Sequence, residues 1–502
     1  MKDSKKIKYN LIAGMLGQVV TVVLGILLPR LVLNNFGSEI NGLLSSVTNI
    51  YAYIAIVEAG VAAASCQALY RAISEKNVDQ TNRVMAATNA YYHRTGIIYL
   101  GLIMLFSVVY PAVIETEISY CSVALIVLFN GIGNVVTYFF HGKYLILLKA
   151  DGKNYVRTSL ELLSGVIKQI GKIILISLGY DIVVVQIIAM LASIFQMLII
   201  VLYVRKTYSW IDLSVEPDFA SISQSKHVFA HEINYLVTSN VDVVLLTVFT
   251  TLKTVSVYSL YVMLFGMVTR VLRIVKDALE FKIAHEFHRC KRSFLEIFGA
   301  YEVYYIAFAF SLLTIVHYFI LPFLKLYTSG VTDINYIDNY LPFLFVLINL
   351  LSAGRYPSDA MIHISGHFEQ TKKSAIAETL INVVVSIALV RSYGIIGVLI
   401  GTVISSLYRT NYLICYVNRT IINRSPFVTY KCWLINFVVC IGIICLSGGI
   451  TVALDSYMRV FLFCIPYSIG VLVIFFVINS VCMPNAFSLI RRIIRDSLNI
   501  NG

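Results

Sequence analysis

The sequence has unusually few charged residues for its length. Of its 502 residues only 13% are charged, 58% are apolar, and the mean hydropathy is +0.80. Soluble domains carry about 25% charged and about 45–50% apolar residues, so a soluble globular enzyme is excluded. A disordered chain is excluded as well, because disordered segments are poor in apolar residues.

The sequence also lacks the motifs of several enzyme classes. No CxxC pair occurs, and the nine cysteines have neither metal-ligand nor disulfide spacing, so we expect free buried thiols. His363 and His367 have i,i+4 spacing but no convergent third ligand, so no metal site is predicted. There is no Walker A motif and no polar segment longer than about 25 residues, which leaves no room for an ATPase or glycosyltransferase domain. We therefore expect no catalytic residues and no cofactor.

Long apolar runs are what the sequence has instead. Segments of about 20 residues, the length that crosses a bilayer, recur to the end of the chain. They lie near 9–33, 40–70, 86–112, 118–140, 156–178, 181–204, 227–250, 255–281, 299–324, 340–363, 374–391, 394–417, 431–453 and 459–482. We therefore predict an all-α integral membrane protein of fourteen helices.

The net charge of +12 is distributed unevenly between the two sides of these helices. With a cytoplasmic N-terminus, the inner loops and tails carry 29 Lys and Arg residues, against only Lys253, Lys325, Arg391 and Arg459 outside. The excess on one side predicts that both termini are cytoplasmic. The positive charge is thus a topology signal and indicates no nucleic-acid partner. The tail SLIRRIIRDSLN (488–499) has the pattern of a basic helix at the membrane surface.

Two hairpins resemble each other. The first has Glu161 early, a turn at Gly179 and an exit at Tyr203; the second has Glu378, Gly394 and Tyr416. They are six spans apart, and an even offset predicts parallel repeats; chance similarity of apolar hairpins is the alternative. We expect a six-helix lobe over 1–210, a cytoplasmic linker over 211–226, a second lobe over 227–421, and a terminal pair with a basic tail over 422–502. Two lobes around an axis are typical of transporters.

Ionisable groups inside the bilayer are costly and face a cavity or a partner. On 156–178, Arg157, Glu161, Lys168 and Lys172 lie on one helix face. The deep cations predict a water-lined cavity for an anion such as a diphosphate; they are Arg30, Lys168, Lys172, Arg270, Arg273, Arg355 and Arg409. Two alternatives remain open. The cations near helix ends can extend their charged groups to the membrane surface. Arg355 can instead form a structural ion pair with Asp359.

The deep carboxylates suggest coupling to H+ or Na+. Buried carboxylates can carry protons or bind cations, and the candidates are Glu58, Asp242, Glu161, Glu378 and Asp359. Fixed salt bridges or hydrogen bonds to neighbouring helices are the alternative.

Three segments resemble a known family. PRLVLNNFGSEINGL (29–43), followed by Glu58, is similar to the N-terminal signature of Wzx-type bacterial polysaccharide exporters. YLILLKADGKNYV (144–156) and YGIIGVLIGTVISSLYR (393–409) are similar to a loop and to helix 12 of the same family. Only Arg30 and Glu58 match residues of the family's motif. The family's cavity cations vary in position, so the resemblance assigns no role to the other deep cations.

The resemblance implies membership of the MOP exporter superfamily, with fourteen helices in two lobes that form a V. Such proteins are thought to flip an undecaprenyl-diphosphate-linked oligosaccharide across the bacterial cytoplasmic membrane by alternating access, coupled to an ion gradient. It implies a monomer, with membrane lipids, a polysaccharide polymerase and chain-length machinery as candidate partners. The alternatives are a peptidoglycan-precursor flippase, a drug antiporter and, from another class, a polysaccharide polymerase. The lack of a large, Arg-containing outer loop speaks against a polymerase.

Overall fold

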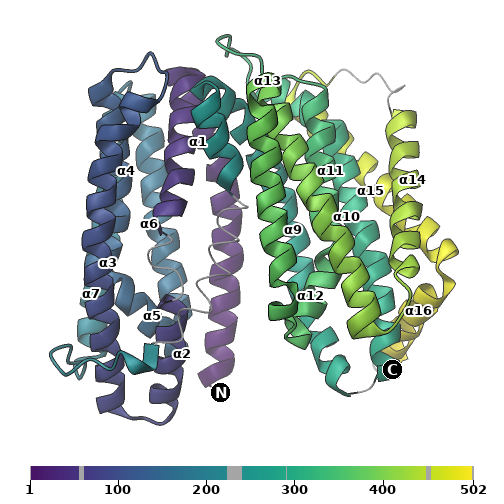
Figure 1. The fold of residues 1–502 in the computed structure, drawn as a ribbon, viewed down its shortest axis with the longest axis horizontal. Coiled ribbons are helices and arrows are strands. Elements are labelled where there is room, and N and C mark those ends of the chain that lie inside the picture. Colours follow the sequence, from purple (N-terminus) through teal and green to yellow (C-terminus); the bar gives the residue numbers. More distant parts are fainter. Residues whose placement is uncertain (1, 56–60, 223–239, 290, 448–453, 500–502) are drawn as a thin grey trace. The chain divides into compact units, whose positions relative to one another are not determined.

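The computed structural model describes residues 2–55, 61–222, 240–289, 291–447 and 454–499. Within these ranges the chain is almost entirely helical and contains no strand (Figure 1). The chain divides into two compact units. Unit 1 comprises residues 1–256 and 330–334, and unit 2 comprises residues 257–329 and 335–502.

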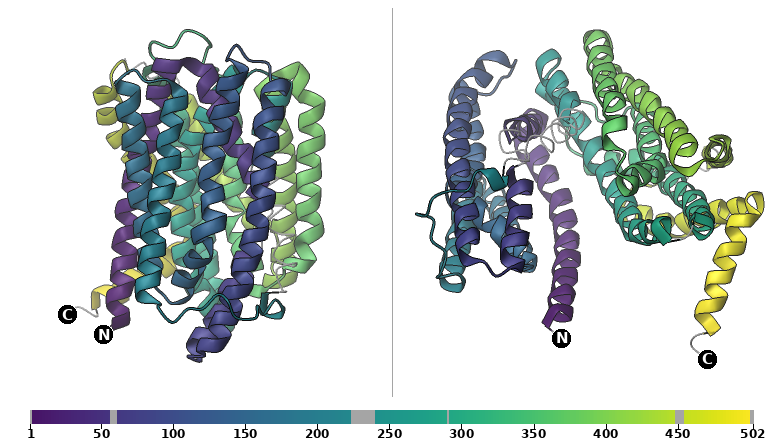
Figure 2. Two further views of the ribbon diagram at one scale, coloured as in Figure 1. Left: turned by 90° about the vertical axis from the view of Figure 1, so that its left-hand side faces the viewer. Right: turned by 60° about the horizontal axis from the view of Figure 1, so that its bottom comes forward.

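Unit 1 is built from the first half of the chain. Its helices are α1 (Lys2–Ile54), α2 (Val61–Ser74), α3 (Val78–Val113), α4 (Tyr120–Val136), the π-helix η2 (Thr137–His141), α5 (Gly142–Ala150), α6 (Asn154–Ser177), α7 (Ile182–Thr207), the short 3₁₀-helix η3 (Ala220–Ile222) and a helix at Asn240–Phe249. α6 packs against both α1 and α7, and α4 packs against α3 and α7. The views of Figure 2 show these helices running side by side.

Unit 2 contains α9 (Leu252–Arg289) except its first turn, α10 (Lys291–Tyr327), α11 (Tyr340–Gly354), α12 (Tyr356–Ser365), α13 (Phe368–Tyr416), the π-helix η4 (Val417–Ile422), α14 (Phe427–Ser447), α15 (Tyr457–Cys482) and α16 (Pro484–Asn499). α10 is central, since it packs against α11, α14, α15 and α16. Its own aromatic side chains contribute to the core of the unit, among them Phe294, Phe298, Tyr301 and Tyr305.

The described helices confirm the all-α membrane architecture but not the count of fourteen. Eight of them are long and apolar enough to cross a bilayer. Several expected spans are joined or divided. α1 holds two helices that meet at Gly37 (φ +81°), and α13 holds two that meet at Gly394 (φ +53°). Both positions need a left-handed backbone, which glycine adopts without steric cost.

Many large apolar side chains lie on the outside of the bundles. Leu105 on α3, Leu446 on α14 and Val481 on α15 are 60%, 78% and 74% exposed. A soluble protein rarely exposes continuous apolar surface of this kind. Helices that satisfy their own backbone groups and carry such surface are suited to lipid contact.

The compact units do not coincide with the lobes expected from the sequence repeat. The helix at 240–249 packs with unit 1, although the expected second lobe begins at 227. The two units are defined by packing, whereas the lobes are predicted from a sequence repeat. The units therefore do not test the lobe boundaries, which stay a prediction. Both repeat hairpins do turn at a glycine with positive φ: Gly179 (+79°) between α6 and α7, and Gly394 within α13.

The structure gives a physical role to the segment 36–43. A Cβ atom on Gly42 would lie 1.8 Å from the Leu252 carbonyl oxygen, so only glycine permits this close helix contact. Beside it, the Asn41 amide donates to Ser256 Oγ at 2.7 Å. Asp333, from the connection between α10 and α11, accepts hydrogen bonds from the Ser38 N–H (2.8 Å) and the Ser38 hydroxyl (2.7 Å). Asp333 thereby caps the helix that begins after Gly37.

We predict that Asp333→Ala lowers the stability of unit 1. Losing a helix cap costs about 1 kcal/mol, and here the buried Ser38 hydroxyl also loses its acceptor. Thermal unfolding of the purified protein in detergent would measure the change, with Thr332→Ala, an exposed neighbour in the same connection, as control. Equal melting temperatures for the Asp333→Ala variant and the wild type would contradict the capping role.

Candidate functional site

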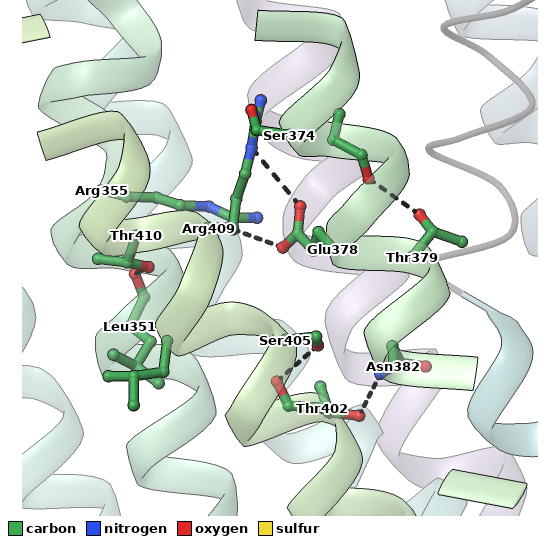
Figure 3. Close-up of polar contacts among 12 residues, drawn as sticks. Leu351, Arg355, Ser374, Glu378, Thr379, Asn382, Thr402, Ser405, Arg409 and Thr410 are labelled. Carbon is green, nitrogen blue, oxygen red and sulfur yellow. Dashed lines mark hydrogen bonds and ion pairs between the residues drawn. The ribbon is translucent and has the colours of Figure 1, made fainter. Parts of the chain in front are cut away.

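A buried cluster of four charged residues lies in unit 2. The Glu378 carboxylate, 5% exposed, is its centre. Arg355 Nη1 donates to Glu378 Oε1 at 2.6 Å, and Arg409 Nε lies 3.6 Å from Oε2. Arg355 Nε is also 3.6 Å from the Asp359 carboxylate. Figure 3 shows the two guanidinium groups converging on Glu378.

The local fold explains how four distant sequence positions meet. Arg355 lies at the junction of α11 and α12, and Asp359 follows in the first turn of α12. Glu378 is on the first half of α13 and Arg409 is on the second half. The turn at Gly394 folds the second half back along the first, as the bond from Asn382 to Thr402 (2.9 Å) also indicates. Arg409 also donates to Ser374 Oγ and, at 3.1 Å, to the Thr371 carbonyl.

This cluster is formally neutral, with two guanidinium groups and two carboxylates. The sequence analysis assigned Arg355 and Arg409 to the anionic substrate, and Glu378 and Asp359 to ion coupling. The structure brings these two predicted groups together in one ion-pair cluster. The Arg355–Asp359 contact is the structural pair that sequence reasoning left open, although Arg355 makes its shorter contact with Glu378. Both arginines therefore have carboxylate partners before any substrate arrives.

The lysines of α6 in unit 1 are in a different situation. Lys172 is 7% exposed, and its ammonium donates to Gln186 Oε1 of α7 at 2.8 Å. The same oxygen accepts from Asn130 Nδ2 of α4 at 3.2 Å. Lys168 lies one turn earlier on the same face of α6. Within the described parts of the chain, no carboxylate lies within 4.0 Å of either ammonium, so this cationic pair is uncompensated.

The remaining predicted site residues lie apart from both clusters. Arg30 is half-buried on α1, and Arg270 and Arg273 are exposed on α9. Glu161 forms an ion pair with Arg157 at 2.8 Å, and both side chains are partly exposed. Asp242 is buried on the helix at 240–249. Glu58 lies outside the described residues.

Sequence reasoning missed the neutral partners of these charges. Gln186 Oε1 accepts from both Lys172 and Asn130, while Ser374 and Thr371 accept from Arg409. The signal for Gln186 and Asn130 is present in the sequence, because both are amides within apolar runs. An amide carries no charge, but inside lipid it also needs a partner.

The loop of the segment 144–156 has a structural explanation. Gly152 (φ +69°) turns the chain between α5 and α6. Asp151 Oδ2 then accepts from the Tyr208 hydroxyl (2.6 Å) and lies 2.8 Å from Lys153 Nζ. Burial, and the hydrogen bond to Asp151, raise the pKa of Tyr208, which follows α7. The motif residues thus connect the start of α6 to the end of α7.

Comparison with known proteins gives a clear answer for the fold alone. No family model matches the sequence, and no curated protein matches it. Among solved structures, the lipid II flippase MurJ in an inward-closed conformation superposes with a TM-score of 0.67 at 15% identity, over 93% of this chain and 99% of MurJ. The chain therefore shares its overall helical fold with this structure.

Two structures of a multidrug resistance MATE family transporter of the MOP superfamily, one inward-facing and one outward-facing, have the same fold. The inward-facing structure gives a TM-score of 0.63 at 14% identity, over 79% of this chain and 95% of the transporter. The outward-facing structure gives 0.55 at 17% identity, over 84% and 96%. The same helical arrangement thus occurs in these structures as in this chain. Identities this low carry no information on the substrate.

Proposed function

We propose that this protein flips an undecaprenyl-diphosphate-linked oligosaccharide from the inner to the outer leaflet of the bacterial cytoplasmic membrane. The observation that carries the proposal is the pair Lys168 and Lys172, for which the described residues supply no carboxylate partner. A buried ammonium without a carboxylate is costly in a membrane protein, and it is retained where it meets an anion. A diphosphate offers several oxygens for charge-assisted hydrogen bonds.

The balance of the two clusters favours this class of passenger over a cationic drug. An exporter of cations needs carboxylates that are free to attract them. In unit 2 each carboxylate of the buried cluster has an arginine partner, and in unit 1 the lysines supply positive charge. Arg30, Arg270 and Arg273 remain candidates for further contacts with the diphosphate or the sugars.

The acidic residues have a separate proposed role. Glu378 and Asp359, held between arginines, and the buried Asp242 are the candidates for coupling transport to an H+ or Na+ gradient. Protonating Glu378 would leave Arg355 and Arg409 close together with less compensating charge, and the two halves of α13 would then rearrange. Glu161 and Glu58 are further candidates for the coupling role. They have less support, because Glu161 is partly exposed and Glu58 lies outside the described residues.

A peptidoglycan-precursor flippase is the second candidate function. The favouring observation is the superposition with the lipid II flippase MurJ, and the lysine pair suits that passenger equally, since it also carries a diphosphate. Sequence features outside the fold, namely the three segments similar to Wzx-type exporters, favour the oligosaccharide.

The deciding experiment measures the sidedness of lipid-linked sugars in a deletion strain. We expect the oligosaccharide-lipid to accumulate on the cytoplasmic leaflet and the gene to restore its translocation. A second strain, depleted of its lipid II flippase, receives the same gene as control and is expected to remain defective. Rescue of the second strain alone would favour the peptidoglycan precursor. Normal translocation in the deletion strain would contradict both functions.

A further inference from the structure

The C-terminal helix α16 presents an amphipathic, basic surface that the transport proposal does not use. α16 begins at Pro484, and only Met483 separates it from the end of the membrane-spanning α15. The right-hand view of Figure 2 shows α16 leaving α15 at a sharp bend. The helix therefore starts at the boundary of the bilayer and does not continue through it.

The two sides of α16 differ in chemistry. At 100° per residue, Arg491, Arg492 and Arg495 fall on one arc, while Ala486, Leu489 and Phe487 fall on the opposite arc. All three arginines are exposed. A helix with one apolar and one cationic face, directly after a membrane span, has the composition of a helix that lies in the plane of the membrane surface.

The apolar side is only partly covered by protein. Ala486 and Leu489 are buried, because this edge of α16 packs against α10 and α15. Phe487, on the other edge of the apolar arc, is 38% exposed. The helix is thus fixed to unit 2 along one edge and offers the other edge and its arginines to the surroundings.

The three arginines of α16 form little ion pairing with the described part of the protein. Arg492 Nη1 lies 3.7 Å from Glu296 of α10, but both side chains are largely exposed, so the pair contributes little. Among the described residues, Arg491 and Arg495 make no ion pair. Arg289, which ends α9 just before α10 begins, adds a further exposed cation to unit 2. The chain thus carries excess positive charge where it leaves the bilayer.

We infer that α16 is a binding surface for anionic phospholipid headgroups of the leaflet on which it lies. The arginines would bind headgroup phosphates, while Phe487 and its edge of the helix insert among the acyl chains. An acidic protein could match the charge, but it would not require an exposed apolar edge at the bilayer boundary. The inference does not depend on which substrate the protein transports.

The test is hydrogen–deuterium exchange of the full chain in vesicles of phosphatidylcholine, with and without phosphatidylglycerol. Each arginine near an anionic surface is worth about a fivefold preference, so three predict exchange in 484–499 that is slower by on the order of 100-fold with phosphatidylglycerol. High salt should reduce the difference. Exchange in α15 should be the same in both vesicles, which serves as the internal reference for folding.

Two variants complete the design. Arg491→Gln/Arg492→Gln/Arg495→Gln should remove the dependence on phosphatidylglycerol, and the control Lys372→Gln/Lys373→Gln, which changes two exposed lysines at the start of α13, should keep it. Equal exchange of α16 in the two vesicle types would overturn the inference, and so would a triple variant that retains the full difference. Protection that appears only with added cytosolic protein would indicate an acidic protein partner instead.

Discussion

Replacing Lys172 by methionine should abolish transport without destabilising the protein. Methionine keeps the length of the apolar stem and removes only the ammonium. A charge at the centre of a membrane helix costs about 2.5–3.5 kcal/mol, and Lys172 recovers part of this cost through Gln186 but gains no carboxylate. Removing the charge should therefore leave the melting temperature unchanged or raise it, while the diphosphate loses its partner.

Two assays on the same preparations test this expectation. The first is translocation of the lipid-linked oligosaccharide in the deletion strain at matched protein levels, and the second is thermal unfolding in detergent. Lys168→Met should give the same loss of transport, and Lys325→Met, at an exposed site at the end of α10, should change neither quantity. Normal transport in both α6 variants would refute the anion path. Loss of transport together with a large loss of stability would assign Lys172 a structural role.

Glu378→Gln should strongly lower the stability of unit 2. Glutamine leaves two guanidinium groups facing each other without the charge that separates them. Removing one member of a buried ion pair costs about 3–5 kcal/mol, because the remaining charge stays desolvated. We expect a much lower protein level in the membrane and loss of transport.

Glu161→Gln is the matched control, since Glu161 occupies the corresponding position of the repeat. If the repeat alone determined the outcome, the two substitutions would have related phenotypes. Their surroundings predict otherwise. Glu161 has one partner and is partly exposed, and such pairs are worth about 1 kcal/mol or less. Equal destabilisation by the two substitutions would contradict this interpretation of the structure.

A double substitution separates the structural role of Glu378 from its proposed role in coupling. Glu378→Gln with Arg355→Met restores charge balance around Arg409 and Asp359, so the protein level should recover. If Glu378 only neutralises the arginines, transport should recover as well. If it carries the coupling ion, transport should remain absent and should no longer respond to the imposed ion gradient.

The sequence by itself determined the fold class. An apolar content of 58% with 13% charge leaves lipid as the only solvent for this chain, and the long apolar runs place helices over each expected span that the structure describes. The sequence also showed which charged residues share a helix face, because residues three or four positions apart lie on the same side of any helix. Gly179 and Gly394 were recognisable as turns for a similar local reason.

Only the tertiary structure decided which charges are compensated. Arg355 and Lys172 look alike in the sequence, since each is a cation within a long apolar run. Arg355 meets Glu378 because Gly394 folds α13 on itself, whereas Lys172 meets an amide of α7. Ion pairing depends on distances between helices, and periodicity within one helix carries no information about its neighbours. Among the described residues the two arginines have carboxylate partners and the two lysines have none, and this difference is the basis on which we propose the lysines as the anion site.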